Sequence, residues 1–238
     1  MPNPQNIESP TLIIGSGRTS SSYVISHLQH TAGVSQELIE NYVCRDLYRA
    51  LAEAPWCEDW HYVSEDQAEV RARIRKTVHD ALITLFPSDL PSWTMKMLWA
   101  GQDPGRTDWL FPDARYLHLV RDPRTCVPSI MERIGHSKRK ACTEYRYANQ
   151  NAFEFRRFGE RYLMVRQEDF LTDRVNTWRR IHAHLGIEFD SSADWTTPIN
   201  VAESQIGRTE RGRRDSAMRW GSLPKPIRRL ARDLGYDE

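Results

Sequence analysis

The sequence predicts a three-layer α/β/α fold with a central parallel sheet, and two observations lead to this fold class. Short β-branched or apolar runs, typical of buried strands, alternate along the 238 residues with longer stretches whose apolar residues recur every three or four positions. Strands that alternate with helices form parallel sheets with helices packed on both faces. The length suits one large domain, so we expect residues 1–238 to form a single domain.

Four segments have the composition of strands. Thr11–Gly15 is β-branched and apolar and runs into a glycine-containing loop, and Arg115–Val120 is apolar and is followed by an Asp-Pro pair. In chain order, the expected strands are Thr11–Gly15, Ser92–Met97, Arg115–Val120 and Arg161–Val165.

Helical spacing fills most of the chain between these strands. In Glu65–Phe86, Val70, Ile74 and Val78 share one face of a helix, and Asp173–Leu185 ends at a glycine, as helices often do. An irregular region is expected at Ile187–Ser222. In chain order, the expected helices are Ser20–His30, Gln36–Ala54, Glu65–Phe86, Arg124–Ile134, Lys138–Phe158, Asp173–Leu185 and Lys225–Leu234.

The charge of the chain is balanced overall but uneven along its length. Lys and Arg number 33 against 32 Asp and Glu, so no global field favours a nucleic-acid partner, and none is expected. Gly207–Arg232 nevertheless carries nine basic residues and two acidic ones. This segment is either a solvated surface or a basic flap over a polyanionic ligand.

Cysteine spacing and hydropathy bear on the cellular compartment. The four cysteines form no C-x-x-C pair and no metal-binding spacing, which favours a reducing compartment. No apolar run reaches the roughly 20 residues that cross a bilayer, and the first residues lack the regions of a signal peptide. We therefore expect a cytoplasmic protein without an integral membrane segment.

The loop after the first expected strand has the composition of an anion-binding site. Loop amides and the positive end of a helix dipole converge on an anion where a strand, a tight loop and a helix follow one another. The spacing from Gly15 to Ser22 nearly matches the P-loop pattern G-x-x-x-x-G-K-[ST], with Ser21 in place of the lysine that reaches the β- and γ-phosphates. This predicts a P-loop-like fold whose ligand carries less charge at its transferred end.

A second motif lies at the end of the strand Arg115–Val120. Arg121 follows the strand directly, and Ser129 lies about two helical turns into the next helix. A guanidinium fork and a hydroxyl at this spacing can hold a phosphate from two sides. His118, inside the same strand, is expected to be a core residue with its polar atoms satisfied.

Together these motifs resemble the sulfotransferase family that uses 3′-phosphoadenosine-5′-phosphosulfate (PAPS). The loop is similar to the family's Pro-Arg-Ser-Gly-Thr-Thr segment for the 5′-phosphosulfate, and His118–Arg124 with Ser129 is similar to its motif for the 3′-phosphate. Arg161–Phe170 resembles a further family segment, in which Glu168 and Asp169 are expected to stabilise the next helix start. The resemblance covers roughly Pro10–Asp190 in family order. The loop residues that it assigns to the nucleotide are Gly17, Arg18, Thr19, Ser20, Ser21 and Ser22.

The chain departs from the family pattern at several points. Ser20 stands where the family has glycine, and Leu98 stands two residues beyond Lys96, where one branch has a catalytic histidine. A bacterial branch takes its base from a glutamate after the first helix, which here selects Glu40 or, with a small gap, Glu37. The family's nucleotide-binding tail is matched only approximately, by Arg211, Arg213 and Arg214 before Trp220.

The resemblance implies in-line transfer of a sulfuryl group from PAPS to a hydroxyl or amine of a small-molecule or glycan acceptor. Arg18 and the loop amides would stabilise charge on the leaving phosphate oxygen, with Lys96 at the sulfate and no metal, since a sulfuryl group carries less charge than a phosphoryl group. Two alternatives stay open. A P-loop-type small-molecule kinase requires a Gly-Lys-Ser/Thr that is absent, and a non-catalytic nucleotide-binding module would accommodate Ser20 and the poorly matched Lys96 region.

Overall fold

A four-stranded parallel sheet forms the centre of the computed structural model, which describes residues 10–32, 67–83, 94–98, 103–192 and 217–237. The strand order is β2-β1-β3-β4, and every pair of neighbours is parallel. The register places Lys96 beside Ile13 and Leu119 beside Gly15, so the carboxyl ends of three strands meet at one edge. The strands are β1 (Thr11–Gly15), β2 (Thr94–Met97), β3 (Arg115–Val120) and β4 (Tyr162–Arg166).

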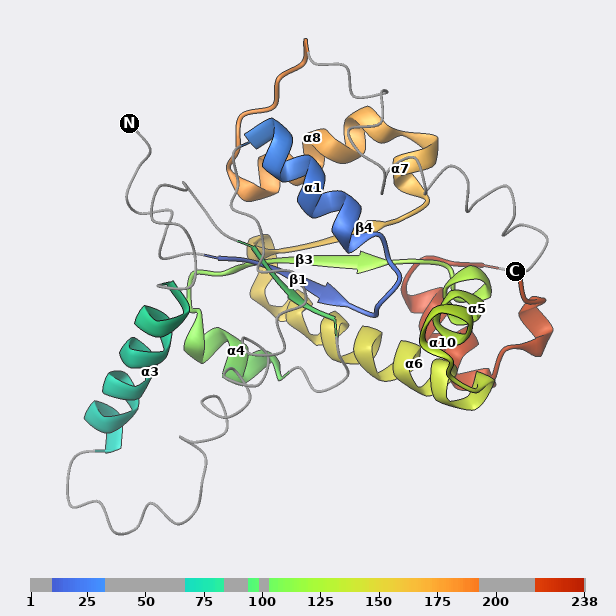
Figure 1. Ribbon diagram of the computed structural model, residues 1–238, viewed down its shortest axis with the longest axis horizontal. Coiled ribbons are helices and arrows are strands. Elements are labelled where there is room, and N and C mark those ends of the chain that lie inside the picture. The colour runs from blue at the N-terminus through green and yellow to red at the C-terminus, as the bar shows by residue number, and fades with distance from the viewer. Residues whose placement is uncertain (1–9, 33–66, 84–93, 99–102, 193–216, 238) are drawn as a thin grey trace.

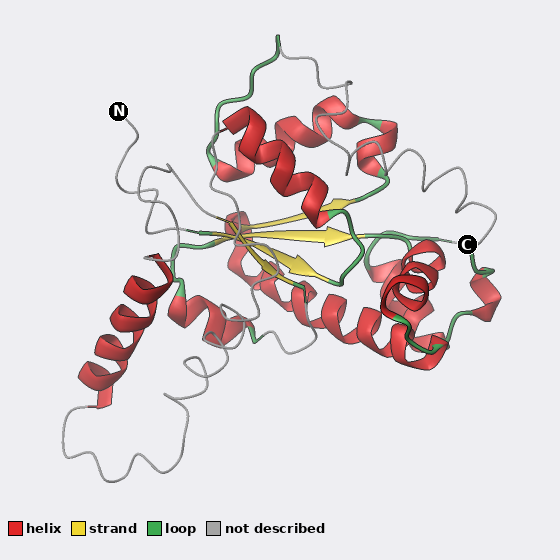
Figure 2. Cartoon of the chain, in the orientation of Figure 1, coloured by secondary structure: helices red, strands yellow, loops and turns green. Residues whose placement is uncertain are grey.

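Helices cover both faces of the sheet and confirm the expected three-layer fold (Figures 1 and 2). One face packs against α1 (Ser21–Ala32), α7 (Asp169–Thr172) and α8 (Arg174–Leu185). The other packs against α4 (Pro104–Leu110), α6 (Lys138–Glu154) and the 3-10 turn η4 (Phe155–Arg161). Helix α3 (Gln67–Ile83) contacts α4. Beyond the carboxyl ends of the strands lie α5 (Pro123–Ile134), the 3-10 turn η5 (Trp220–Ser222) and α10 (Lys225–Asp233).

The alternation of side chains in β1 divides the core into two layers. Leu12 and Ile14 point into the cluster that holds α4 and α6, whereas Ile13 points into the cluster that holds α1 and α8. All three are fully buried, as the period of two in a strand covered on both faces requires. Trp178 of α8, also fully buried, fills the centre of the second layer.

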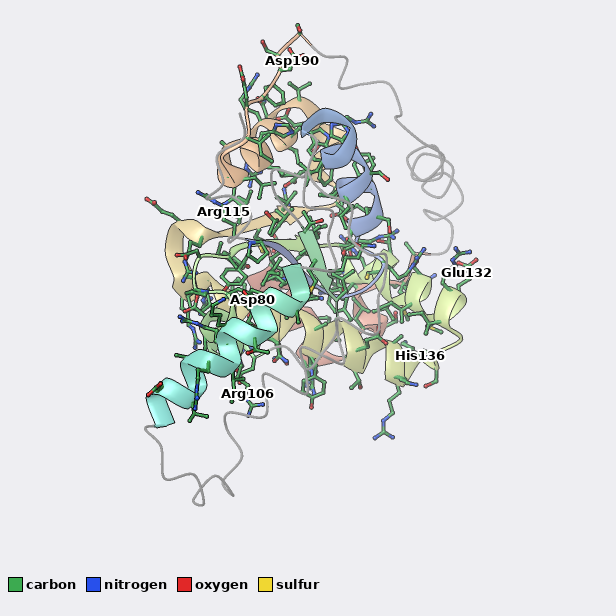
Figure 3. The ribbon with its side chains drawn as sticks, turned by 60° about the vertical axis from the view of Figure 1, so that its left-hand side comes forward. Asp80, Arg106, Arg115, Glu132, His136 and Asp190 are labelled. Carbon is green, nitrogen blue, oxygen red and sulfur yellow. The ribbon has the colours of Figure 1, made fainter. Side chains whose placement is uncertain are left out.

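A third apolar cluster lies beyond the end of β3. Val120, Cys126 and Tyr145 pack there against residues of η5 and α10, including Trp220 and Leu230. This cluster brings the C-terminal helix against the α5–α6 pair. In Figure 3, Arg115 at the start of β3 and Glu132 on α5 lie on opposite sides of the molecule, which marks the direction of the strands.

Most boundaries agree with the expected elements, and the differences have local causes. The expected helix Lys138–Phe158 ends at Glu154 and continues as the 3-10 turn, in which Gly159 has a φ of 59°. Helix α4 was not predicted, although its Asp-Pro start, with Asp103 accepting a hydrogen bond from the Arg106 N–H, is a standard N-terminal signal. The four-residue α7 was not predicted either. The expected helix Gln36–Ala54 lies outside the described residues.

No helix within the described ranges is long and apolar enough to cross a membrane.

His118 is the core residue that the sequence predicts. It is fully buried, with Nδ1 2.7 Å from the Tyr162 hydroxyl and Nε2 3.1 Å from Asn149 Oδ1. Burial lowers the pKa of His118 from 6.5 to about 4, although the hydrogen bond with Asn149 opposes the shift. Between pH 6.5 and about 4, the imidazole of His118 therefore stays neutral in the folded protein but takes up a proton in the unfolded chain.

We expect His118 to make folding pH-dependent between pH 6.5 and 4. A pKa lowered on folding contributes stability that is complete above the unfolded value and is lost as the pH falls, by roughly 3 kcal/mol at most for this shift. Urea unfolding of the wild type and of His118→Gln should show a smaller loss of the free energy of unfolding in the variant over this range. Parallel pH profiles for the two proteins would contradict the assignment.

Candidate active site

The loop between β1 and α1 leaves the sheet at a glycine that no other residue could replace without rearrangement. Gly15 has a φ of 122°, and a Cβ placed there would lie 2.6 Å from the carbonyl oxygen of Leu119. Beyond it, Ser16 and Thr19 are fully buried, and the Thr19 hydroxyl donates to the Ser16 carbonyl at 3.1 Å. The loop is therefore packed tightly against β3 and closed by its own hydrogen bond.

Two residues of this loop adopt the left-handed conformation although neither is glycine. Arg18 has a φ of 69° and Ser20 a φ of 68°. Ser20 is followed directly by the first helical residue of α1, and its carbonyl accepts the hydrogen bond from Val24 that opens the helix. A left-handed residue before a right-handed one turns successive N–H groups toward one point, which forms an anion-binding concavity at the helix N-terminus. The backbone thus has the shape that the sequence predicts for an anion site.

Arg121 reaches this loop from the end of β3. Its side chain is 4% exposed, with Nε donating to the Thr125 hydroxyl at 2.9 Å and Nη1 to the Arg18 carbonyl at 3.3 Å. No described carboxylate forms an ion pair with it. A buried cation held only by neutral oxygens is costly unless an anion binds beside it.

Ser129 lies in α5 and contacts the loop after β1 through the side chain of Arg18. It is 2% exposed, and its hydroxyl accepts a hydrogen bond from Arg18 Nε at 3.3 Å. Arg18 therefore joins three separate elements, because its side chain contacts Ser129 and its carbonyl contacts Arg121. The sequence predicted a shared phosphate site for Arg121 and Ser129 but not these contacts of Arg18. Asp122 begins α5 by accepting a hydrogen bond from the Arg124 N–H at 2.7 Å, which sets the direction of that helix.

Lys96 approaches from the neighbouring strand β2. The parallel register sets it beside Ile13, and its Nζ lies 3.3 Å from the Ser22 hydroxyl in the first turn of α1. Ser22 and the loop residues Gly17 to Ser21 thus lie between the cations of β2 and β3. The site has a strongly positive character, with basic side chains on two sides of the concavity.

Cys126 is part of this site, although the sequence did not predict it there. Its Sγ lies 3.7 Å from the Ser16 hydroxyl and 3.5 Å from the Gly17 carbonyl, so α5 contacts and supports the loop through this side chain. Burial raises the pKa of the Cys126 thiol to about 11, against the opposing effect of Arg121. The group is therefore a neutral thiol. Its position three residues before Ser129, on the same helix face, is the signal that could have identified it.

Glu168 corrects one expectation. Its side chain makes no capping bond to α7; instead its two oxygens accept hydrogen bonds from the Asp122 N–H at 3.0 Å and the Tyr236 hydroxyl at 2.8 Å. Both donors are distant in sequence, so the local pattern carried no sign of them. Glu168 thus supports the end of β3 and the N-cap residue of α5 rather than the start of α7.

Some predicted site residues lie outside the part of the chain that the structure describes. They are Glu37, Glu40, Arg211, Arg213 and Arg214. Among the described residues, no group of three or more His, Cys, Asp and Glu side chains could hold a metal ion.

A family model and several solved structures that are similar to this chain all point to one protein family. A family model described as the sulfotransferase family matches residues 10–191. The solved sulfotransferase domain of the olefin synthase from Synechococcus PCC 7002 has a TM-score of 0.65 and 21% identity, over 100% of this chain and 98% of that chain. The sulfotransferase domain from the curacin biosynthetic pathway has a TM-score of 0.56 and 18% identity, over 96% and 98%.

A third similar structure is sulfotransferase STF9 from Mycobacterium avium, with a TM-score of 0.54 and 15% identity over 97% of this chain and 78% of that chain. At these identities the structural likeness concerns the fold. No curated protein sequence matches the chain.

Ser20→Gly should stabilise the free protein by roughly 0.5–1 kcal/mol, because relief of the left-handed strain exceeds the entropy that a glycine adds to the unfolded chain. Thermal or urea unfolding measures the difference. Ser137→Gly is the control, since Ser137 has a φ of −61° and no such strain; this variant should be less stable than the wild type, because it also loses the hydrogen bond from the Lys140 N–H that caps α6. A Ser20→Gly variant that is less stable than the wild type would show that the serine side chain contributes more than its backbone costs.

Proposed function

Because the chain belongs to the sulfotransferase family, we propose that it transfers a sulfuryl group from PAPS to a hydroxyl or amine of a small-molecule or glycan acceptor. The observation that carries the proposal is the buried Arg121 guanidinium, which has no ion-pair partner among the described residues. It donates to the Arg18 carbonyl, and the Arg18 side chain donates to Ser129. A second anion-binding feature, the concave loop at the start of α1, adjoins it. Two adjacent anion sites suit a nucleotide that is phosphorylated at two positions.

The roles of the described residues follow from their positions. Arg121 and Ser129 would bind the 3′-phosphate, and the loop from Gly17 to Ser22 would bind the 5′-phosphosulfate through its amides and hydroxyls. Arg18 is the side chain of that loop placed between the two sites. Lys96, at Ser22, would contact the sulfuryl oxygens. We propose that Arg211, Arg213 and Arg214 add charge around the phosphates.

The reaction exchanges one oxygen for another at sulfur. The acceptor oxygen forms a bond to sulfur as the bond from sulfur to the 5′-phosphate oxygen breaks, and the acceptor proton passes to a base, for which we propose Glu40 or Glu37. The leaving 3′-phosphoadenosine-5′-phosphate (PAP) gains negative charge at the 5′-phosphate. Arg18 and the loop amides are preorganised where that charge develops, which is how such donors lower a barrier.

The alternatives differ from this proposal in a measurable way. Ser21, in place of the P-loop lysine, is buried and too short to reach a terminal phosphate, which disfavours a kinase. A non-catalytic module would bind PAP and show no turnover.

The described cysteines Cys126 and Cys142 are free thiols, which supports our proposal of a cytoplasmic location. An assay with labelled PAPS and small-molecule extracts, which follows the transfer of sulfate, tests the function directly.

Arg121→Ala should weaken PAP binding by about 2–3 kcal/mol, the scale of a charge-assisted hydrogen bond. Adenosine 5′-phosphosulfate lacks the 3′-phosphate, so its affinity should fall far less. Calorimetry with both ligands gives the comparison. Arg115→Ala is the control, because Arg115 lies at the other end of the same strand (Figure 3). Equal losses for the two ligands would remove Arg121 from the 3′-phosphate site.

Glu40→Gln or Glu37→Gln should lower kcat by a factor on the order of 100 or more and leave PAP affinity intact, because a base acts in the chemical step rather than in nucleotide binding. Steady-state kinetics and calorimetry separate the two effects. Glu132→Gln, an exposed carboxylate on α5, serves as the control. Normal turnover in both variants would place the base elsewhere.

A further inference from the structure

The end of α10 is shaped by a glycine that turns the chain back toward the sheet. Gly235 has a φ of 84°, and its N–H donates to the Arg232 carbonyl at 2.9 Å, while the Tyr236 N–H donates to the Ala231 carbonyl at 2.9 Å. These two bonds form a Schellman motif, which ends a helix and fixes the direction of the next residue. The motif directs Tyr236 against the carboxyl ends of β3 and β4, where it is 6% exposed.

A single carboxylate links this turn to the residue after Arg121. Glu168 accepts the Tyr236 hydroxyl on one oxygen at 2.8 Å and the Asp122 N–H on the other at 3.0 Å. Burial and the charge of Glu168 raise the pKa of Tyr236 above its ordinary value, so the phenol keeps its proton and donates it. Hydrogen bonds to a charged acceptor are stronger than those between neutral groups, so the bond from Tyr236 helps to hold the Glu168 carboxylate in place.

The peptide group that follows Arg121 is held from both sides. The Asp122 N–H donates to Glu168, and the Arg121 carbonyl, which belongs to the same peptide plane, accepts the Tyr145 hydroxyl at 2.9 Å. Holding this plane restricts the ψ torsion of Arg121, which is one of the torsions that set the direction in which its side chain leaves the strand. The adjoining Val120 carbonyl is also bound, by the Gln167 N–H at 2.8 Å.

We propose that Tyr236 and Glu168 are positioning residues for the anion site, through which the C-terminal turn sets the orientation of Arg121. The proposal rests on the proposed function, because it takes the 3′-phosphate as the ligand of Arg121. It assigns to the last described turn of the chain a part in nucleotide affinity, although neither side chain contacts the nucleotide site itself.

The chain offers a clean way to remove this link alone. Arg166 donates to the Gly235 carbonyl at 3.2 Å and pairs with Asp169, so the turn keeps an anchor when the Tyr236 hydroxyl is absent. Tyr236→Phe therefore deletes one hydrogen bond and leaves the ring in the apolar cluster around α10. Tyr147→Phe is the matched control, since Tyr147 is 45% exposed on α6.

The experiment measures the affinity of each variant for two probes, PAP and adenosine 5′-monophosphate. Tyr236→Phe should weaken PAP by about fivefold or more, the lower end of the usual coupling between two sites, and should leave adenosine 5′-monophosphate almost unchanged. Glu168→Gln should show the same selectivity, because a glutamine presents an NH₂ group to one of the two donors. Tyr147→Phe should bind both probes as the wild type does.

A merely structural role predicts a different pattern. Equal losses for the two probes, or a lower melting temperature with unchanged affinity for PAP, would overturn the inference. In an Arg121→Lys background, Tyr236→Phe should cause no further loss of PAP affinity, because the guanidinium that it orients is gone. A full additional loss in that background would also overturn it.

Failure of the proposed function gives a separate signature. If the wild type binds both probes equally weakly, the 3′-phosphate assignment is wrong. The positioning inference then depends on the NMR resonance of the Arg121 Nε–H, identified by its loss in Arg121→Lys. A shift of this resonance in Tyr236→Phe and none in Tyr147→Phe supports the orientation of Arg121 by Tyr236, and an unchanged resonance in both overturns it.

Discussion

The burial of the Arg121 guanidinium is the constraint on which the site depends. Arg121 has no ion-paired carboxylate among the described residues, and a buried cation of this kind loses hydration that neutral oxygens return only in part. Here the carbonyl of Arg18 and the hydroxyl of Thr125 supply those oxygens. The same contacts join β3 to the loop after β1 and to α5. The hydrogen bonds that solvate the guanidinium therefore also hold these three elements together. An anion bound at this point would give the guanidinium the charged partner that the described residues do not provide.

The strain in the loop follows from the same requirement. For N–H groups to converge at the start of α1, the backbone must enter the left-handed region at Arg18 and Ser20, where neither residue has the freedom of glycine. The surroundings hold this conformation through the hydrogen bond from Thr19 to Ser16 and through Cys126, which supports Ser16 and Gly17 from α5. The loop is thereby shaped before a ligand arrives, which reduces the ordering cost of binding.

The sequence predicted the sheet well because strands buried on both faces leave a local signature, such as the continuous β-branched and apolar run of β1. The short α4 and α7 were missed since so few residues establish no periodicity, although Asp103 marked the first of them. In the site, the placement of Arg121 and Ser129 on two elements that both contact the loop after β1 could be predicted from strand and helix spacing. The bond between Glu168 and Tyr236 could not, because it joins residues 68 apart that only the packing of α10 brings together. The expectation of one domain over residues 1–238 stays a prediction.

Among the described residues, the ionisable groups nearest Arg121 have other partners or stay neutral. The carboxylate of Asp122, next to Arg121 in sequence, caps α5 and pairs with the Arg124 guanidinium at 2.7 Å. Both oxygens of Glu168 are taken up by an N–H and a phenol. The thiol of Cys126, whose pKa burial raises to about 11, stays neutral although Arg121 and Arg18 favour its ionisation. Among the described residues, no carboxylate forms an ion pair with Arg121, so an external anion gains an ion pair that this part of the folded protein does not make.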